Sequence, residues 1–176
     1  HSGSTRQKIR NSKFVITGDQ KQREQLHVMN YAFPQLYGQL KLHKPEQSMR
    51  LVVAFYSHPT FRLARYLVDW FKTVTQFKPT YNIKNSTELA LKLQHLKFSA
   101  TAQLISFNVV SMYTRTPVQK AIDITLTHLS QANQANEVIE DFEMLRSQCI
   151  DKNLCVFRKT THQFPDGLPM GGPLSP

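Results

Sequence analysis

This 176-residue sequence has no long hydrophobic run, only two cysteines and no segment that resembles a secretory signal. It has no apolar run long enough to span a bilayer, and its N-terminal residues are polar and basic, unlike a secretory signal. The two cysteines, Cys149 and Cys155, match neither a C-x-x-C redox motif nor a four-ligand zinc site. We therefore expect an intracellular protein of a reducing compartment, without membrane spans or disulfide bonds.

Several common catalytic motifs are also absent. The sequence has no Gly-x-Ser-x-Gly nucleophile elbow, no phosphate-binding Walker loop and no internal repeat. The seven histidines are scattered without a His-x3-His pair, and no two aspartates are adjacent. These absences argue against α/β-hydrolases, Walker-type nucleotidases and repeat arrays.

Acidic residues are few compared with basic ones. Twenty-two Lys and Arg against twelve Asp and Glu give a formal net charge of +10 and a pI of about 9.8. Such an excess favours a polyanionic partner, and nucleic acid is the first candidate because its binding releases counterions. The positive residues are spread along the chain, so an inert basic surface remains an alternative.

The remaining pattern predicts a mixed α/β fold of the α+β class, with an antiparallel sheet backed by helices. Residues 1–13 are polar and we expect a flexible leader, in which His1 to Ser4 derive from an expression tag. Two helix starts are indicated by Asn85 with Glu88 and by Thr116 as N-cap. The predicted helices cover about 20–31, 60–77, 85–97, 116–130 and 136–150, and the predicted strands cover 40–44, 50–56, 103–109 and 154–159.

Three segments occur in an order that is typical of one polymerase family. They are Leu36-Tyr37-Gly38-Gln39-Leu40-Lys41-Leu42-His43-Lys44-Pro45 followed by Arg50-Leu51-Val52-Val53, then Ser106-Phe107-Asn108-Val109-Val110-Ser111-Met112-Tyr113-Thr114, and Asp166-Gly167-Leu168-Pro169-Met170-Gly171-Gly172-Pro173-Leu174-Ser175-Pro176. Together they resemble the finger and palm motifs of reverse transcriptases of Penelope-like retroelements, which are relatives of telomerase. The resemblance covers about residues 36–176, and the glycine-rich third segment is its most specific part.

The resemblance implies a right-hand polymerase with fingers and part of the palm. Residues 14–100 would form the fingers with part of the palm, and residues 101–176 would form palm, ending before the aspartate-pair hairpin and the thumb. The implied activity is RNA-directed DNA synthesis with two Mg²⁺ ions, a primer–template and dNTPs. A nuclear location would follow from the same resemblance.

Individual roles are also implied by the resemblance. Asn108 stands where the family has a metal-binding aspartate, and the backbone carbonyl of Val109 would be a second metal ligand. Tyr113 would be the steric gate beneath the sugar, with a packed core tyrosine as the alternative. The residues expected to contact the nucleotide are Lys41 (with Lys44 competing for this role), Arg50, Met170 and Gly171.

Departures from the family pattern limit the expected activity. Asparagine offers one amide oxygen and no charge, so a metal site at Asn108 is expected to be weakened or lost. Leu40 and Leu51 replace the prolines usual beside the motif cations. We therefore expect a catalytically inactive fragment that binds primer–template and dNTP. The alternatives are a non-catalytic nucleic-acid-binding module and, with less support, a protein-interaction scaffold. Uncovered apolar sheet surface would favour a homo-oligomer or the rest of a polymerase as partner.

Overall fold

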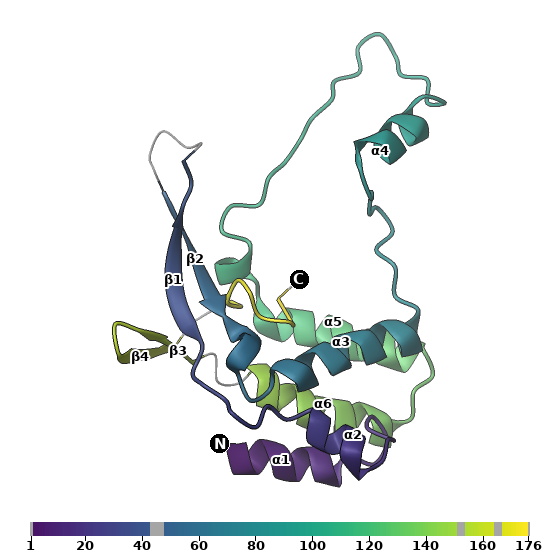
Figure 1. Cartoon of the computed structure of the whole chain (residues 1–176). Coiled ribbons are helices and arrows are strands. Elements are labelled where there is room, and N and C mark those ends of the chain that lie inside the picture. Colours follow the sequence, from purple (N-terminus) through teal and green to yellow (C-terminus); the bar gives the residue numbers. More distant parts are fainter. Residues whose placement is uncertain (1, 43–47, 151–153, 164–166, 176) are drawn as a thin grey trace.

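The fold is seen in a computed structural model, which describes residues 2–42, 48–150, 154–163 and 167–175 (Figure 1). Its helices are α1 (Ser2–Asn11), α2 (Gln20–Gln25), α3 (Phe61–Thr75), α4 (Ser86–Leu93), α5 (Val118–Gln131) and α6 (Asn136–Ile150), and its strands are β1 (Gln35–Leu40), β2 (Met49–Ala54), β3 (Leu154–Phe157) and β4 (Thr160–Gln163). Two short 3-10 turns are η1 (Phe55–Ser57) and η2 (Tyr113–Arg115). This composition confirms the α+β class.

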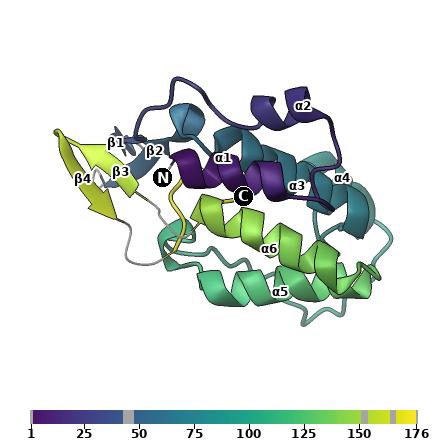
Figure 2. The ribbon, with the colours of Figure 1, turned by 90° about the horizontal axis from the view of Figure 1, so that it is seen from below.

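The main core lies between helices α1, α3, α5 and α6. Leu63 and Leu67 of α3 are fully buried one turn apart, as the apolar period of this segment predicts. On α6, Leu145 is fully buried, and Phe142 stacks on Trp70 with ring centroids 5.5 Å apart. The helices predicted over 60–77 and 136–150 are therefore confirmed. The sheet lies at one end of these helices rather than flat against them (Figures 1 and 2).

The N-terminal segment corrects the expectation of a flexible leader over residues 1–13. Residues Ser2–Asn11 form α1, which packs on α6 with Ile9 buried. The loop after α1 is held by Asp141 of α6, which is only 8% exposed. One carboxylate oxygen of Asp141 accepts hydrogen bonds from Ser12 Oγ at 2.8 Å and from the N–H groups of Lys13, Phe14 and Val15 at 3.1, 2.9 and 2.9 Å.

Arg23 of α2 ties α2 to the C-terminal end of α1. Its Nη1 donates to the carbonyl oxygens of Ile9 and Ser12 at 2.8 and 2.7 Å, and its Nη2 donates to that of Ile16. The carbonyl of Ile9 belongs to the last turn of α1, where intrahelical donors run out, and those of Ser12 and Ile16 lie in the loop after it. α2 itself begins at Asp19, whose side chain caps it, and it is shorter than the predicted helix over 20–31.

The four strands form one sheet in the order β2-β1-β3-β4. β1 and β2 pair antiparallel from Gln35↔Ala54 to Leu40↔Met49, and β3 and β4 also pair antiparallel. β1 and β3 are parallel, so the prediction of a purely antiparallel sheet is wrong in this one pairing. The first strand also lies earlier than predicted: it ends at Leu40, and Lys41 and Leu42 follow it without strand structure. Residues 43 and 44 of the expected strand over 40–44 lie outside the described residues.

A long segment between α3 and α5 extends away from the helices and carries α4 (Figure 1). The predicted start of α4 is confirmed, because the Asn85 side chain accepts a hydrogen bond from the N–H of Glu88 at 2.9 Å. The buried strand predicted over 103–109 is wrong: these residues form no regular element, and Leu104 and Phe107 are 94% and 91% exposed.

The segment rejoins the helices at α5, whose start differs from the prediction in detail. Pro117, not Thr116, is the N-cap of α5, and the Thr116 hydroxyl donates to the carbonyl oxygen of Met112 at 2.7 Å. The Thr116 side chain therefore belongs to the preceding turn rather than to the helix. Within the described parts of the chain, no helix is both long and apolar enough to cross a bilayer.

Candidate nucleic-acid interface

The hairpin of β1 and β2 carries the two cations that the sequence predicts for phosphate contact. Arg50 of β2 pairs with Gln39 of β1, and Lys41 donates its backbone N–H to the carbonyl oxygen of Ser48 at 3.0 Å. Paired residues share a face of a hairpin, and faces alternate along each strand. Lys41 and Arg50 therefore lie on the same face, with the pair of Leu40 and Met49 between them. Arg50 is exposed and Lys41 is half-buried.

The glycine-rich third segment meets the free edge of β2. The N–H of Val53 donates to the carbonyl oxygen of Met170 at 2.8 Å. Gly171 has a φ of +106°, and a Cβ at this position would lie 2.4 Å from the carbonyl oxygen of Val53. A side chain is therefore excluded by the neighbouring strand as well as by the backbone conformation. The missing side chain of Gly171 serves packing against β2.

Tyr113 also contacts the glycine-rich third segment. The N–H of Leu168 donates to the carbonyl oxygen of Tyr113 at 2.8 Å. Gly167, with a φ of +70°, approaches so closely that a Cβ would lie 2.4 Å from that oxygen. Residues 167–171 therefore connect Tyr113 to β2, and parts of all three motif segments come together. The half-buried side chain of Tyr113 is compatible with partial packing.

Asn108 and Val109 are not brought into this cluster. Both are exposed and lie in the irregular stretch that was predicted to be a buried strand. In the described part of the chain, no hydrogen bond joins either residue to the hairpin or to residues 167–171. Within the described residues, no strand pairs with the apolar stretch around Asn108.

The described residues do not fit a two-magnesium centre. Hard divalent cations prefer carboxylate oxygens, whereas Asn108 supplies a neutral amide. Among the residues whose placement is described, no three His, Cys, Asp or Glu side chains gather as a metal-binding group. Asp151 and Asp166 lie outside those residues, as does Lys44. Asp123 instead accepts a hydrogen bond from Gln119 at 2.9 Å on the surface of α5.

A partly buried histidine lies where the hairpin joins α3. His58 follows η1, and its Nδ1 is 2.8 Å from Thr60 Oγ1. Burial lowers the pKa of His58 from 6.5 to about 4, because a charged imidazole would lose its hydration there. The ring of Phe55 packs at 5.4 Å from it, between centroids. At neutral pH the imidazole of His58 is therefore uncharged.

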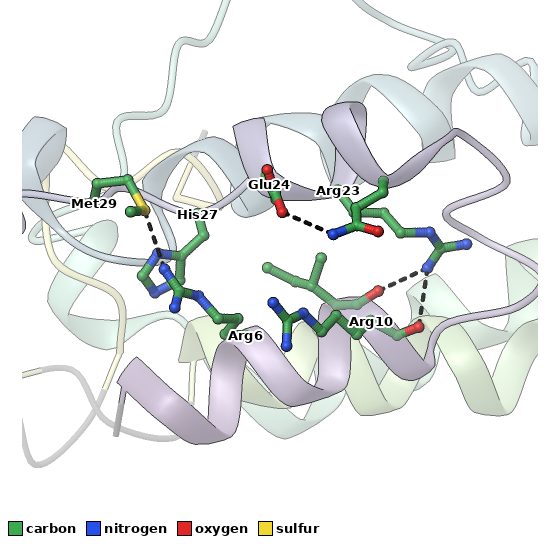
Figure 3. Close-up of a pocket in the computed structure, with 8 residues that line it drawn as sticks. Arg6, Arg10, Arg23, Glu24, His27 and Met29 are labelled. Atoms are coloured by element: carbon green, nitrogen blue, oxygen red, sulfur yellow. Dashed lines mark hydrogen bonds between the residues drawn. The ribbon is translucent and has the colours of Figure 1, made fainter.

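Sequence reasoning missed a pocket between α1 and α2. It is lined by Arg6, Ile9, Arg10, Gln20, Arg23, Glu24, His27 and Met29 and has a volume of about 740 Å³ (Figure 3). The available signal was the spacing of four between Arg6 and Arg10, which places both on one helical face. The spacing is informative only if the segment is a helix, and residues 1–13 are expected from their sequence to be a flexible leader.

Comparison with known proteins adds no relative to this description. No family model, no curated protein sequence and no solved structure matches the chain. A functional proposal therefore has to be argued from the residues and their arrangement.

Proposed function

We propose that this chain binds nucleic acid as the fingers and partial palm of a reverse-transcriptase-type polymerase, and that it does not catalyse nucleotide addition by itself. The observation that carries the proposal is the meeting of three motif segments that are far apart in sequence. Val53 of β2 bonds to Met170, and Tyr113 bonds to Leu168, both at 2.8 Å. Motif likeness alone does not require such contacts.

The charges on the hairpin support a phosphate-bearing partner. Lys41 and Arg50 share one face, and neither forms an ion pair within the described residues. An arginine can hold a phosphate with two parallel hydrogen bonds, and a lysine adds a point charge. The net charge of +10 favours approach of a polyanion to this face. In the proposal, these cations contact the backbone of a primer–template or the phosphates of a dNTP, and Tyr113 lies beneath the sugar.

A non-catalytic binding module is the second candidate, and Asn108 favours it. The residue is neutral and exposed, and the described carboxylates form no metal-binding group. An Asn108→Asp change in a longer chain that includes an aspartate pair separates the two candidates. Primer extension above background favours a polymerase fragment, and extension that stays at background favours the binding module.

Salt-dependent binding to a primer–template duplex tests the proposal directly. We expect the affinity, measured by fluorescence anisotropy, to fall steeply between low and high salt. Each phosphate contact contributes a slope of about −0.9 in log affinity against log salt, so the double variant Lys41→Gln/Arg50→Gln should reduce the slope by about 2.

The matched control removes the same two charges from exposed positions of α3, as Arg65→Gln/Lys72→Gln. This variant has the same net charge as the hairpin variant, but Lys41 and Arg50 are unchanged in it. Equal slopes for the two double variants would place the binding surface elsewhere. An affinity that does not change with salt in the original chain would refute nucleic-acid binding altogether.

A further inference from the structure

The pocket between α1 and α2 has an excess of positive charge. Three arginines line it, and Glu24 is its single carboxylate. Arg6 and Arg10 project from α1 into the space beneath α2, and Glu24 and His27 lie across from them (Figure 3). The volume of about 740 Å³ falls within the range of sites for small organic ligands.

The three arginines differ in how their guanidinium groups are used. Arg23 is fully engaged with backbone carbonyls, including those of Gly18 at 3.1 Å and Ser12 at 2.7 Å. It therefore has a structural role. Arg6 donates to the sulfur of Met29 at 3.1 Å, which is a weak acceptor. In the described residues, the guanidinium of Arg10 takes part in no hydrogen bond or ion pair.

No group in the pocket neutralises Arg6 and Arg10. Glu24 accepts from Gln20 Nε2 at 3.1 Å and forms no ion pair with either arginine within the described chain. Like charges one helical turn apart repel each other and disfavour the helix. Arg10 is favourably placed for the helix dipole, but Arg23 already satisfies the carbonyls at that end. Within the described residues, neither Arg6 nor Arg10 is therefore paired with a carboxylate.

We propose that this pocket binds a phosphate-bearing small molecule of nucleotide size, with its phosphate between Arg6 and Arg10. Two guanidinium groups provide enough donors to surround a phosphate, which can also displace the weak Met29 acceptor. The pocket volume of about 740 Å³ is larger than a bare phosphate ion would fill. The exposed side chain of Met29 offers an apolar surface to an organic group, and Gln20 with Glu24 offers hydrogen bonds to its hydroxyl or amino groups. This site is separate from the hairpin and does not rest on the function proposed above.

Calorimetric titration with ADP, adenosine and inorganic phosphate tests this proposal. We expect ADP to bind, adenosine to show no detectable binding, and phosphate to bind more weakly than ADP. Arg6→Gln/Arg10→Gln should weaken ADP binding at least about tenfold, because each charged hydrogen bond lost is worth about one such factor. Arg65→Gln/Lys72→Gln is the matched charge control and should leave ADP binding unchanged.

A second variant keeps the test independent of any effect on α1. Glu24 is exposed, and Glu24→Gln removes the negative charge while retaining an amide oxygen. It should tighten ADP binding by about twofold, which corresponds to about 0.4 kcal/mol, because it removes the repulsion between the carboxylate and the phosphates of ADP. Phosphate binding as tight as ADP binding would reduce the site to an adventitious anion site. ADP affinity unchanged in the Arg6/Arg10 variant and in Glu24→Gln would overturn the proposal.

Discussion

Replacing Asp141 by alanine is expected to destabilise the protein by about 3 kcal/mol. Its carboxylate accepts four hydrogen bonds from residues 12–15. After Asp141→Ala, the exposed residues Lys13 and Phe14 can turn their N–H groups to water. Ser12 and Val15 are each 1% exposed, so their two donors stay buried without an acceptor. An unsatisfied buried donor costs about 1–3 kcal/mol, which gives a total of about 2–6 kcal/mol.

Urea unfolding followed by far-UV circular dichroism measures this loss, and a thermal melt gives a second value. For a chain of this size, 3 kcal/mol corresponds to a fall of roughly 6–12 °C in the melting temperature. Asp141→Asn should lose about half as much, because the amide retains one acceptor oxygen. Glu140→Ala is the matched control, since Glu140 is the exposed neighbour on α6. A difference below about 1 kcal/mol between Asp141→Ala and Glu140→Ala would refute the assignment of these hydrogen bonds.

Two further predictions concern His58 and the exposed segment. The pKa of His58 is lowered to about 4 in the folded protein, whereas an unfolded histidine titrates near 6.5. Between these values the unfolded state binds the extra proton, so the contribution of His58 to stability is complete above about pH 6.5 and is lost as the pH falls toward 4. His58→Gln should flatten the urea midpoint over this window, and an unchanged pH profile would contradict the assignment. Phe107→Ser should change the free energy of unfolding by less than about 0.5 kcal/mol, because Phe107 is exposed. Leu145→Ala, which removes a buried side chain, should cost about 2–5 kcal/mol. A large effect of Phe107→Ser in urea unfolding would show that residues 103–109 are packed.

Local signals in the sequence were sufficient for elements whose stability depends on near neighbours. The apolar period of 60–77 predicted α3, and the Asn85 cap predicted the start of α4. Both signals describe residues that contact each other within one or two turns. The α+β class could be predicted because such local patterns indicate most of the helices and strands.

Long-range contacts explain the errors. The stretch 103–109 has the composition of a buried strand, yet a strand also needs a partner, which nothing local specifies. α1 was missed because its sequence is polar, and its docking depends on Ile9 and on Asp141, a residue more than 120 positions away. Polar composition gives no indication that a distant carboxylate will hold the loop after the helix.

The candidate interface could be predicted as a set of residues but not as an arrangement. Lys41 and Arg50 were identified from the hairpin motif, and the register places them on one face. The bonds from Met170 to Val53 and from Leu168 to Tyr113 could not be inferred, because they join backbone atoms of distant segments. The close approach of Gly171 to the backbone of β2 could not be inferred either, and its contact with a nucleotide stays a prediction.

The attachment of α1 through Asp141 has a consequence for the order of folding. Arg23 joins α2 to Ile9 of α1 across 14 residues, a short loop that closes at little entropic cost. The bond from Ser12 to Asp141 closes 129 residues, and contacts of such separation form late. We therefore expect the contacts between α1 and α2 to form before α1 docks on α6. During that interval the face of α6 that carries Leu145 and Asp141 is open to water, and a newly made chain is most vulnerable to association through this face.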